Sequence, residues 1–365
     1  MNVGKLKNFG KYGVAITNIS YPFDKNEIDE IRQLLLTELV VTFPKINYSE
    51  KQLWELGNCI GDVQTWGRKA GEITPGWTGY TDDEGKTLYP GLDKVTGKKR
   101  KDENSFEGLV TGVSTILNWH CNELPSLTTP NYVILQGVTG TKGTLTQVCE
   151  MIDPFENEND ESKEYMRKLD TLWGCVTDQK YFIMPTLKEG SLGGIGFNVG
   201  DVPYTSEHWL SGINSTEKEI EHFKKTGTDL KGHTQGDIDL DILEKPLITK
   251  LPNGKEGVHF SPAQTMDISN LNLKGNERLF DGKTLQPSPF NTNYRPSNSF
   301  LKLREHIIKE YIQEKYIYSH EWEDGDLFIM NQTVCIHRRA NAQGGVKIPR
   351  LKLENRLLNR LELTI

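Results

Sequence analysis

The sequence predicts an α+β protein, in which helices near the start of the chain are combined with strands that recur to its end. Residues 24–36 and 49–57 carry apolar side chains at helical spacing. Residues 357–365 instead alternate polar and apolar side chains, as a strand does when one of its faces is buried. With 365 residues, the chain is long enough to bury a large core.

The N-terminal part of the chain predicts strands and helices in alternation. They span residues 14–19, 24–36, 40–44 and 49–57, in the order strand, helix, strand, helix. Asp24 and Ser49 stand where a helix N-cap is expected, and Gln52 completes a capping box with Ser49. Pro44 stops the second strand, and Gly57 is expected to end the second helix.

Two long stretches predict irregular insertions within a single domain that spans residues 1–365. They cover about 64–106 and about 187–240 and are rich in turn-forming and polar residues. Long irregular stretches inside a compact domain are uncommon and often serve as functional lids. The first is expected to cover the active site, and we interpret its basic run Lys98–Lys101 as a solvated loop.

The remaining patterns predict further strands, two helices and a hairpin. Strands are expected at 116–120, 130–137, 316–322, 327–330, 334–336 and 357–365, helices at 162–173 and 297–315, and a hairpin at 245–262. An Asn-Gly pair at 253–254 supplies the tight turn that such a hairpin needs.

Composition excludes several classes of protein. A net charge of −7 argues against a broad nucleic-acid-binding surface. The five cysteines are odd in number and lack CxxC spacing, which favours reduced thiols over a disulfide framework or a zinc ribbon. The N-terminus lacks a signal-peptide pattern, and no apolar run approaches the roughly 18 residues that span a bilayer. We therefore expect a cytoplasmic protein without membrane or nucleic-acid partners, and its oligomeric state, homo-oligomers included, stays open.

Side chains of two functional kinds gather near the end of the chain. His337 follows the short apolar run 334–336, and Arg356 and Arg360 lie on one face of the last strand. Imidazole binds transition metals, and a guanidinium grips a carboxylate through two parallel hydrogen bonds. These residues predict a metal ligand beside a carboxylate-binding group. The alternative for each arginine is a salt bridge at the surface or at the mouth of the fold.

A second histidine, His120, ends an apolar strand and is closely followed by Asn122 and Glu123. A single histidine in this setting is often structural. A nearby carboxylate and a second histidine on a late strand, however, have the spacing of a 2-His-1-carboxylate iron site. The sequence therefore predicts that His120 and His337 share one metal ion.

The order of these pieces resembles that of the taurine dioxygenase-like and clavaminate synthase-like iron(II)/2-oxoglutarate oxygenases over nearly the whole chain. The matching pieces are 41–44, 52–61, 119–120, 130–135, 245–248, 252–255, 322–329, His337 and 356–360. The resemblance implies a double-stranded β-helix, a jelly-roll barrel of the cupin type with helices packed outside it. It also implies Fe(II), with 2-oxoglutarate and O2 as co-substrates.

The resemblance implies a role for each candidate residue. His120 and His337 would be the iron ligands. Arg360 would bind the distal carboxylate of 2-oxoglutarate, with Thr144 as its hydroxyl partner. Arg356 would lie near the other end of this co-substrate.

The third iron ligand departs from the family pattern, which is His-x-Asp or His-x-Glu. Two positions after His120 stands Asn122, and Glu123 follows it. Either a slight bulge lets Glu123 reach the metal, or Asn122 occupies that position with weaker binding. Glu123 is favoured because an anionic oxygen offsets the charge of Fe(II) better than an amide does. A vacant position, as in halogenating relatives with a small residue there, does not fit these two side chains.

The function implied by this resemblance is hydroxylation of an unactivated C–H bond of a small molecule, with release of succinate and CO2. Two alternatives remain. Asn122 in place of a carboxylate would suit a barrel that has lost its chemistry and acts as a binding or scaffold protein. The basic run Lys98–Lys101 would suit an oxygenase that acts on a nucleobase or a protein side chain.

Overall fold

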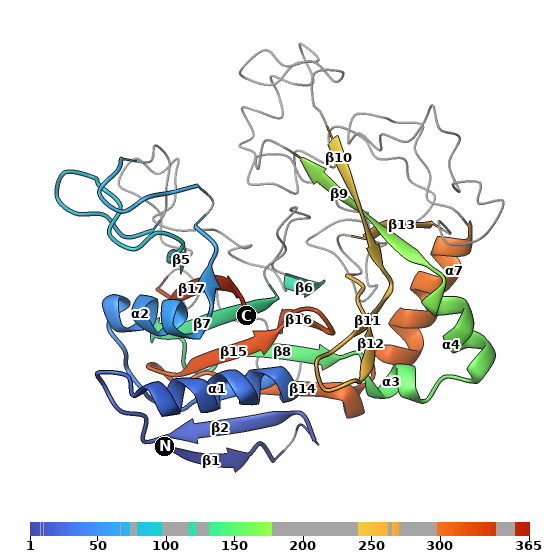
Figure 1. The fold of residues 1–365 in the computed structure, drawn as a ribbon, viewed down its shortest axis with the longest axis horizontal. Helices are drawn as coiled ribbons and strands as arrows, with labels where there is room; N and C mark the ends of the chain where they lie inside the picture. The colour runs from blue at the N-terminus through green and yellow to red at the C-terminus, as the bar shows by residue number, and fades with distance from the viewer. Residues whose placement is uncertain are drawn as a thin grey trace, which may run out of the picture.

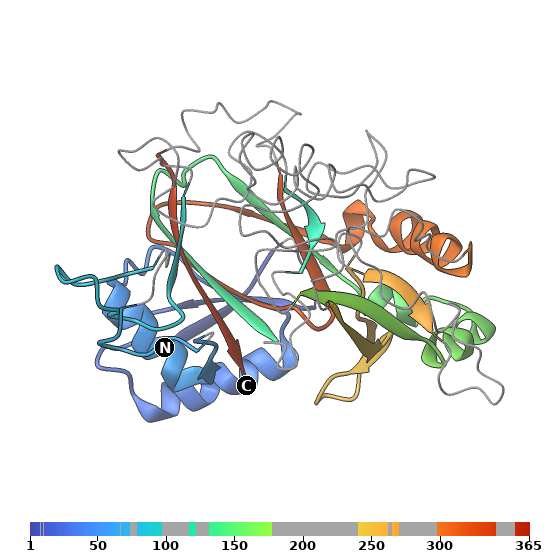
Figure 2. The ribbon, with the colours of Figure 1, turned by 90° about the horizontal axis from the view of Figure 1, so that it is seen from above.

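Two β-sheets face each other at the centre of the molecule, and helices lie outside them (Figures 1 and 2). The structure is a computed structural model, and it describes residues 1–7, 9, 11–65, 67–73, 79–96, 117–121, 131–176, 240–261, 265–269, 298–340 and 355–365. The basic run Lys98–Lys101 and nearly all of the predicted insertion 187–240 lie outside these residues. Sheets and helices together confirm the predicted α+β class.

The larger sheet has the order β1-β2-β3-β15-β7-β17-β4, and β5 also pairs with β17. Its strands are β1 (Asn2–Lys5), β2 (Gly13–Thr17), β3 (Val40–Phe43), β4 (Asp62–Val63), β5 (Asp93–Thr96), β7 (Tyr132–Thr139), β15 (Leu327–Asn331) and β17 (Leu357–Thr364). The pairs are antiparallel except β2 with β3. β17 therefore lies inside the sheet, with neighbours on both sides.

The smaller sheet has the order β14-β8-β16-β6, and all its pairs are antiparallel. Its strands are β6 (Leu117–His120), β8 (Leu145–Glu150), β14 (Ile317–Glu321) and β16 (Cys335–Ala340). Two further groups lie beside it: β9 (Asp170–Val176) pairs with β10 (Leu240–Pro246) and β13 (Thr265–Ser269), and β11 (Ile248–Lys250) forms the predicted hairpin with β12 (Glu256–Val258).

The core between the two sheets is built from both of them. Val133, Phe328 and Leu358 of the larger sheet pack in one buried cluster with Val148 and Cys335 of the smaller sheet. Because side chains alternate along a strand, this cluster fixes which positions of each strand face inward. On β17 the inward positions include Leu358, Arg360 and Glu362, in agreement with the alternation expected from the sequence.

Two N-terminal helices cover the outer face of the larger sheet. α1 (Lys25–Thr37) and α2 (Glu50–Ile60) pack their apolar side chains against Leu361 and Leu363 of β17 and their neighbours. The predicted caps are confirmed, because Asp24 accepts hydrogen bonds from backbone N–H groups of α1 and Ser49 forms a capping box with Gln52.

The predicted end of α2 at Gly57 is wrong, because the helix continues to Ile60 and is capped by Gly61. Gly57 instead lets the helix approach the sheet closely. A Cβ atom at this position would lie 2.9 Å from Cδ1 of Leu361. The glycine therefore reflects helix-to-sheet packing rather than a helix end.

Helical segments also cover the outer face of the smaller sheet. They are α3 (Asp153–Glu156), α4 (Asp160–Arg167), α7 (Asn298–His306), a π-helical turn (Ile307–Tyr311) and a 3-10 turn (Glu314–Tyr316). Trp119, Cys149 and Ile336 of the sheet pack against these segments. The predicted helix 162–173 is correct only to Arg167, because residues from Asp170 form β9 with partners that lie far along the chain. Among the described helices, none is long and apolar enough to cross a membrane.

Candidate active site

His120 and His337 lie directly opposite each other on β6 and β16. Their ring centroids are 4.3 Å apart and the rings are inclined by 45°. The preceding residues, Trp119 and Ile336, pack on the outer face of the sheet, so the alternation of side chains directs both imidazoles inward. Each histidine is about 5 % exposed. The structure thus brings together the two predicted metal ligands.

The surroundings of His337 favour its neutral form. Burial lowers the pKa of His337 well below its ordinary value, and the nearby His120 and Arg360 lower it further. A neutral imidazole presents a nitrogen lone pair to a metal, whereas an imidazolium cannot. The pair of buried imidazoles therefore fits a divalent transition metal.

The two candidates for the third ligand, Asn122 and Glu123, lie outside the described residues. Cys121 is described and buried, and it directly precedes them. Among the described residues, no cluster of three or more histidine, cysteine, aspartate or glutamate side chains is suited to a metal. The choice between Asn122 and Glu123 therefore stays open.

Arg360 lies in the interior between carboxylates. Its Nη2 atom is 3.5 Å from Oδ2 of Asp93, and its Nη1 atom is 3.6 Å from Oε1 of Glu362. Asp93 stands directly opposite Arg360 on β5, and Arg68 lies 3.7 Å from its other oxygen. Burial opposes the charge of Arg360, but Glu362 and then Asp93 outweigh it and raise the pKa of Arg360.

Arg356 lies in a different electrostatic environment, just before β17. It is buried, and no described carboxylate pairs with it. Its Nε atom has no hydrogen-bond partner among the described residues. Burial lowers the pKa of Arg356 to about 9, and the charge of Arg339 contributes to this shift. Arg356 is thus a buried cation next to another cation, an arrangement that favours the binding of an anion.

Thr144 lies just before β8 and is fully buried. Its hydroxyl donates a hydrogen bond to the carbonyl of Thr141 at 2.7 Å, and its carbonyl accepts one from the backbone N–H of Trp322. The described contacts of Thr144 include neither Arg356 nor Arg360. Its role as a hydroxyl partner in co-substrate binding stays a prediction.

Three charged residues near the site received no role from the sequence. Glu362 lies on the same face of β17 as Arg360, which the alternation of that strand already indicated. Arg339 follows His337 by two positions, so the same periodicity places it inward. Asp93 gave no such signal, because it lies in a stretch expected to be irregular and reaches the site only through the pairing of β5 with β17.

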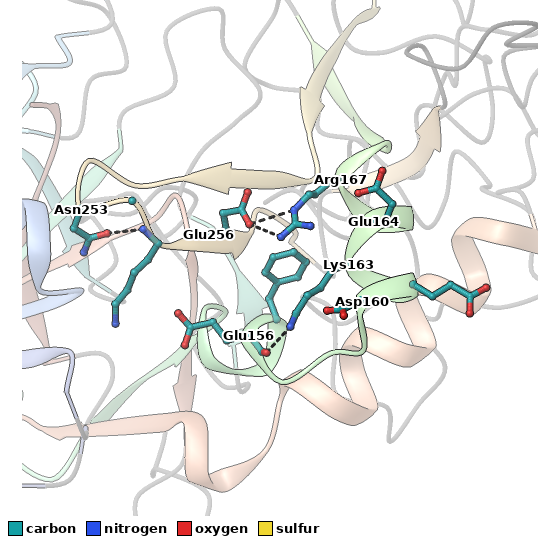
Figure 3. Close-up of a pocket in the computed structure, with 11 residues that line it drawn as sticks. Glu156, Asp160, Lys163, Glu164, Arg167, Asn253 and Glu256 are labelled. Atoms are coloured by element: carbon teal, nitrogen blue, oxygen red, sulfur yellow. Dashed lines mark hydrogen bonds and ion pairs between the residues drawn. The ribbon is translucent and has the colours of Figure 1, made fainter.

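The structure also contains a groove outside the two facing sheets, with a volume of about 920 Å³ (Figure 3). It lies between α3 and α4 on one side and the β11–β12 hairpin on the other. Arg167 and Glu256 point toward each other across it and form hydrogen bonds of 3.2 and 2.7 Å. None of the predicted site residues lines this groove.

Comparison with known protein families assigns the chain to one family. A family model described as "Taurine catabolism dioxygenase TauD, TfdA family" matches residues 2–354. The chain belongs to the TauD/TfdA family. Membership confirms the predicted family and the predicted enzyme class, a non-haem Fe(II)/2-oxoglutarate-dependent dioxygenase that uses Fe(II), 2-oxoglutarate and O2. The match ends just before Arg356, so it does not cover the two arginines of β17.

Solved structures similar to this TauD/TfdA family member share its fold at low sequence identity. A taurine dioxygenase from Burkholderia xenovorans is 14 % identical, with a TM-score of 0.55 over 99 % of this chain and 90 % of that one. A protein of the same organism described as a "putative alpha-ketoglutarate dependent 2,4-D dioxygenase" is 14 % identical, with a TM-score of 0.54 over 99 % of this chain and 97 % of that one.

A third similar structure is AAD-2, solved in complex with Mn(II) and N-oxalylglycine. It is 12 % identical, with a TM-score of 0.55 over 100 % of this chain and 97 % of that one. At these identities the likeness concerns the fold alone. Comparison with curated proteins gives no match.

Proposed function

We propose that this TauD/TfdA family member hydroxylates an unactivated C–H bond of a small molecule, with release of succinate and CO2, inside a double-stranded β-helix. The observation that carries the proposal is the buried pair His120 and His337, directly opposed on neighbouring strands with ring centroids 4.3 Å apart. Two neutral imidazoles and one carboxylate leave coordination positions open for substrates, which is the arrangement of non-haem Fe(II) oxygenases.

We propose that Glu123 is the third ligand, as the sequence favours, because an anionic oxygen balances part of the Fe(II) charge. Bound Fe(II), together with 2-oxoglutarate and O2, supplies the oxidising chemistry. The chain itself has to hold the metal, orient both substrates and exclude bulk water. The buried, inward-facing histidines and the apolar cluster of Val148, Phe328 and Leu358 supply a largely dry interior for this purpose.

The contacts of the two β17 arginines favour Arg356, rather than Arg360, as the group that binds the distal carboxylate of 2-oxoglutarate. Arg356 is buried without a described carboxylate, so an incoming anion would compensate its charge. The charge of Arg360, by contrast, already faces Asp93 and Glu362. This exchanges the roles that the resemblance implies for these two residues.

The position of the arginines relative to the histidines supports the same assignment. Arg360 is close enough to His337 to lower its pKa, whereas Arg356 is influenced by Arg339 instead. The distal carboxylate of 2-oxoglutarate is the end that points away from the metal. We therefore assign Arg356 to that end and Arg360 to the metal end of the pocket.

Succinate release tests the proposed function. The purified enzyme with Fe(II) and 2-oxoglutarate is offered amino acids, sulfonates such as taurine, aryloxyacetates such as 2,4-D, nucleosides and short peptides. We expect one class to stimulate succinate release with formation of a hydroxylated product. His337→Ala should abolish this turnover, and coupled activity retained in that variant would contradict the ligand assignment. Failure to bind Fe(II) anaerobically with 2-oxoglutarate present would instead indicate a binding or scaffold protein.

We also propose that residues 1–365 form a single domain and that the enzyme acts in the cytoplasm on a small-molecule substrate. The cytoplasmic location is supported by the cysteines, since no disulfide forms among those that the structure describes.

A further inference from the structure

Arg360 belongs to a cluster of charges that is already balanced within the interior. Asp93 faces it across β5, and Glu362 follows it on the same face of β17. Arg68 completes the cluster from the other side of Asp93. Among the described residues, the cluster therefore contains two guanidinium groups and two carboxylates, and their formal charges sum to zero when both acids are ionised.

Both acids of the cluster are buried. The side chains of Asp93 and Glu362 are only 5 % and 3 % exposed. The distances from Arg360 to the two carboxylates are longer than the 2.7–2.9 Å or so of a tight charge-assisted hydrogen bond. The guanidinium therefore keeps N–H groups that another acceptor could use, but its charge is cancelled by two carboxylates.

Arg356, which lies just before β17, provides the contrast. It is four positions away, more deeply buried than Arg360, and has no described carboxylate partner. In the part of the chain that the structure describes, no carboxylate thus compensates the charge of Arg356, whereas two carboxylates compensate that of Arg360. Arg356 therefore favours the binding of an anion, whereas Arg360 does not.

We propose that the part of the primary substrate that lies against Arg360 is uncharged, with hydrogen-bonding groups such as a hydroxyl or an amide. The proposal rests on the proposed function and names the substrate class of that same site. An anionic group at Arg360 would enter a cluster whose described charges sum to zero, so repulsion by the two carboxylates would offset attraction by the two guanidinium groups. A neutral hydroxyl or amide can accept from the guanidinium and donate to a carboxylate, so no buried charge loses its partner.

A matched pair of probes tests this charge preference. Methanesulfonamide and methanesulfonate have nearly the same shape but differ in charge. The full-length enzyme is loaded with Mn(II) and N-oxalylglycine, and the relaxation of the probe methyl protons by Mn(II) reports binding next to the metal. The experiment is run at pH 8, because burial raises the pKa of Glu362 to about 7.

We expect the wild-type enzyme to bind methanesulfonamide at least about tenfold more tightly than methanesulfonate. Glu362→Gln, which removes one carboxylate without changing the shape of the side chain, should bring the two affinities within about threefold of each other. Adding Arg360→Gln to that variant should weaken methanesulfonate binding again. Thermal unfolding of each variant establishes that it is folded. Asp93→Asn is the second variant if Glu362→Gln does not fold.

The proposal is overturned if the wild-type enzyme binds methanesulfonate as tightly as methanesulfonamide, or if neither acid variant changes the ratio. Binding of N-oxalylglycine to the Mn(II)-loaded wild-type enzyme, measured first by calorimetry, tests the proposed function separately. If N-oxalylglycine does not bind, the co-substrate site itself is wrong. If it binds and the charge preference is missing, only the present inference fails.

Discussion

His337 on β16 is paired directly with His120 on β6, although more than two hundred residues separate them in the sequence. The two rings face the interior, and the residues next to them, Arg338 and Trp119, stack on the outer face at 4.6 Å. The register of one strand pair thus positions both imidazoles. A shift of this register by one residue would turn one of the imidazoles outward.

This pairing predicts that both histidines are required for metal binding. His120→Gln and His337→Gln should each lower the affinity for Fe(II) or Mn(II) by more than about 100-fold, because a neutral amide is a poorer ligand than imidazole. Anaerobic calorimetry measures the affinity. His320→Gln is the matched control, since His320 is a buried histidine of the same sheet that contacts Tyr318 and Asp326. Equal loss in all three variants would point to unfolding rather than ligation.

The third ligand can be decided by two neighbouring substitutions. Glu123→Gln should lower the Fe(II) affinity by at least about 10-fold, whereas Asn122→Ala should change it by less than about threefold. The reason is that only the glutamate supplies a negative charge to the metal. The same calorimetric titration measures both. The reverse ranking would assign the position to Asn122.

The assignment of the arginines predicts unequal effects on the co-substrate. Arg356→Gln should raise the 2-oxoglutarate concentration needed for half-maximal succinate release by about 10- to 100-fold, as expected for loss of a charge-assisted hydrogen bond. Arg360→Gln should raise it by less. Arg338→Gln is the control, because this neighbouring arginine lies on the outer face over Trp119. A larger effect for Arg360→Gln would restore the role that the resemblance gave it.

Glu362 predicts a specific dependence of stability on pH. Burial raises the pKa of Glu362 from 4.5 to about 7, and Asp93 adds to this effect while Arg360 opposes it. The folded protein therefore holds this proton more tightly than the unfolded chain, so the contribution of Glu362 to stability falls as pH rises from about 4.5 to 7. Glu362→Gln has no such titration.

The measured quantity is the unfolding free energy of Glu362→Gln minus that of wild type. This difference should be higher at pH 8 than at pH 5 by on the order of 1–3 kcal/mol. Denaturant unfolding at the two pH values measures this. Glu150, whose pKa burial also raises to about 7, is present in both proteins and cancels. An equal effect of the substitution at both pH values would show that Glu362 does not titrate in this range.

The approach of α2 to β17 predicts unequal costs for two alanine substitutions. A Cβ atom at Gly61 would clash with the backbone carbonyl of Thr364, whereas at Gly57 it would meet the flexible end of Leu361. Gly61→Ala should destabilise the fold by about 1–3 kcal/mol, and Gly57→Ala by less than about 1.5 kcal/mol. Urea unfolding compares the two, and a larger cost at Gly57 would contradict this account.

Local patterns predicted the parts of this protein that depend on nearby residues. The caps at Asp24 and Ser49, the Asn-Gly hairpin and the alternation of β17 were all predicted correctly. The errors arose where distant segments decide the outcome. Gly57 resembles a helix end until Leu361 packs against it, and Asp170–Val176 becomes a strand only through partners such as β10.

The same distinction applies to the candidate site. Residue type and spacing predicted the candidate histidines and arginines, and the structure places His120 beside His337. The difference between Arg356 and Arg360 could not be predicted, because it depends on Asp93, which arrives from another strand. Glu362 could be placed beside Arg360 from the alternation of β17, but a partner that comes from a different strand leaves no pattern along the chain.

In the smaller sheet as described, β6 is one of the two edge strands, since it is bonded to β16 on one side only. His120 therefore sits on the strand that can detach at the smallest loss of backbone hydrogen bonds, while His337 is anchored between two neighbours. If His120 and His337 hold the iron as proposed, its release would begin with separation of β6 from the sheet, and the stack of Arg338 on Trp119 opposes that motion. The lifetime of the metal-loaded enzyme would then be set by local opening at one edge of the smaller sheet rather than by global unfolding.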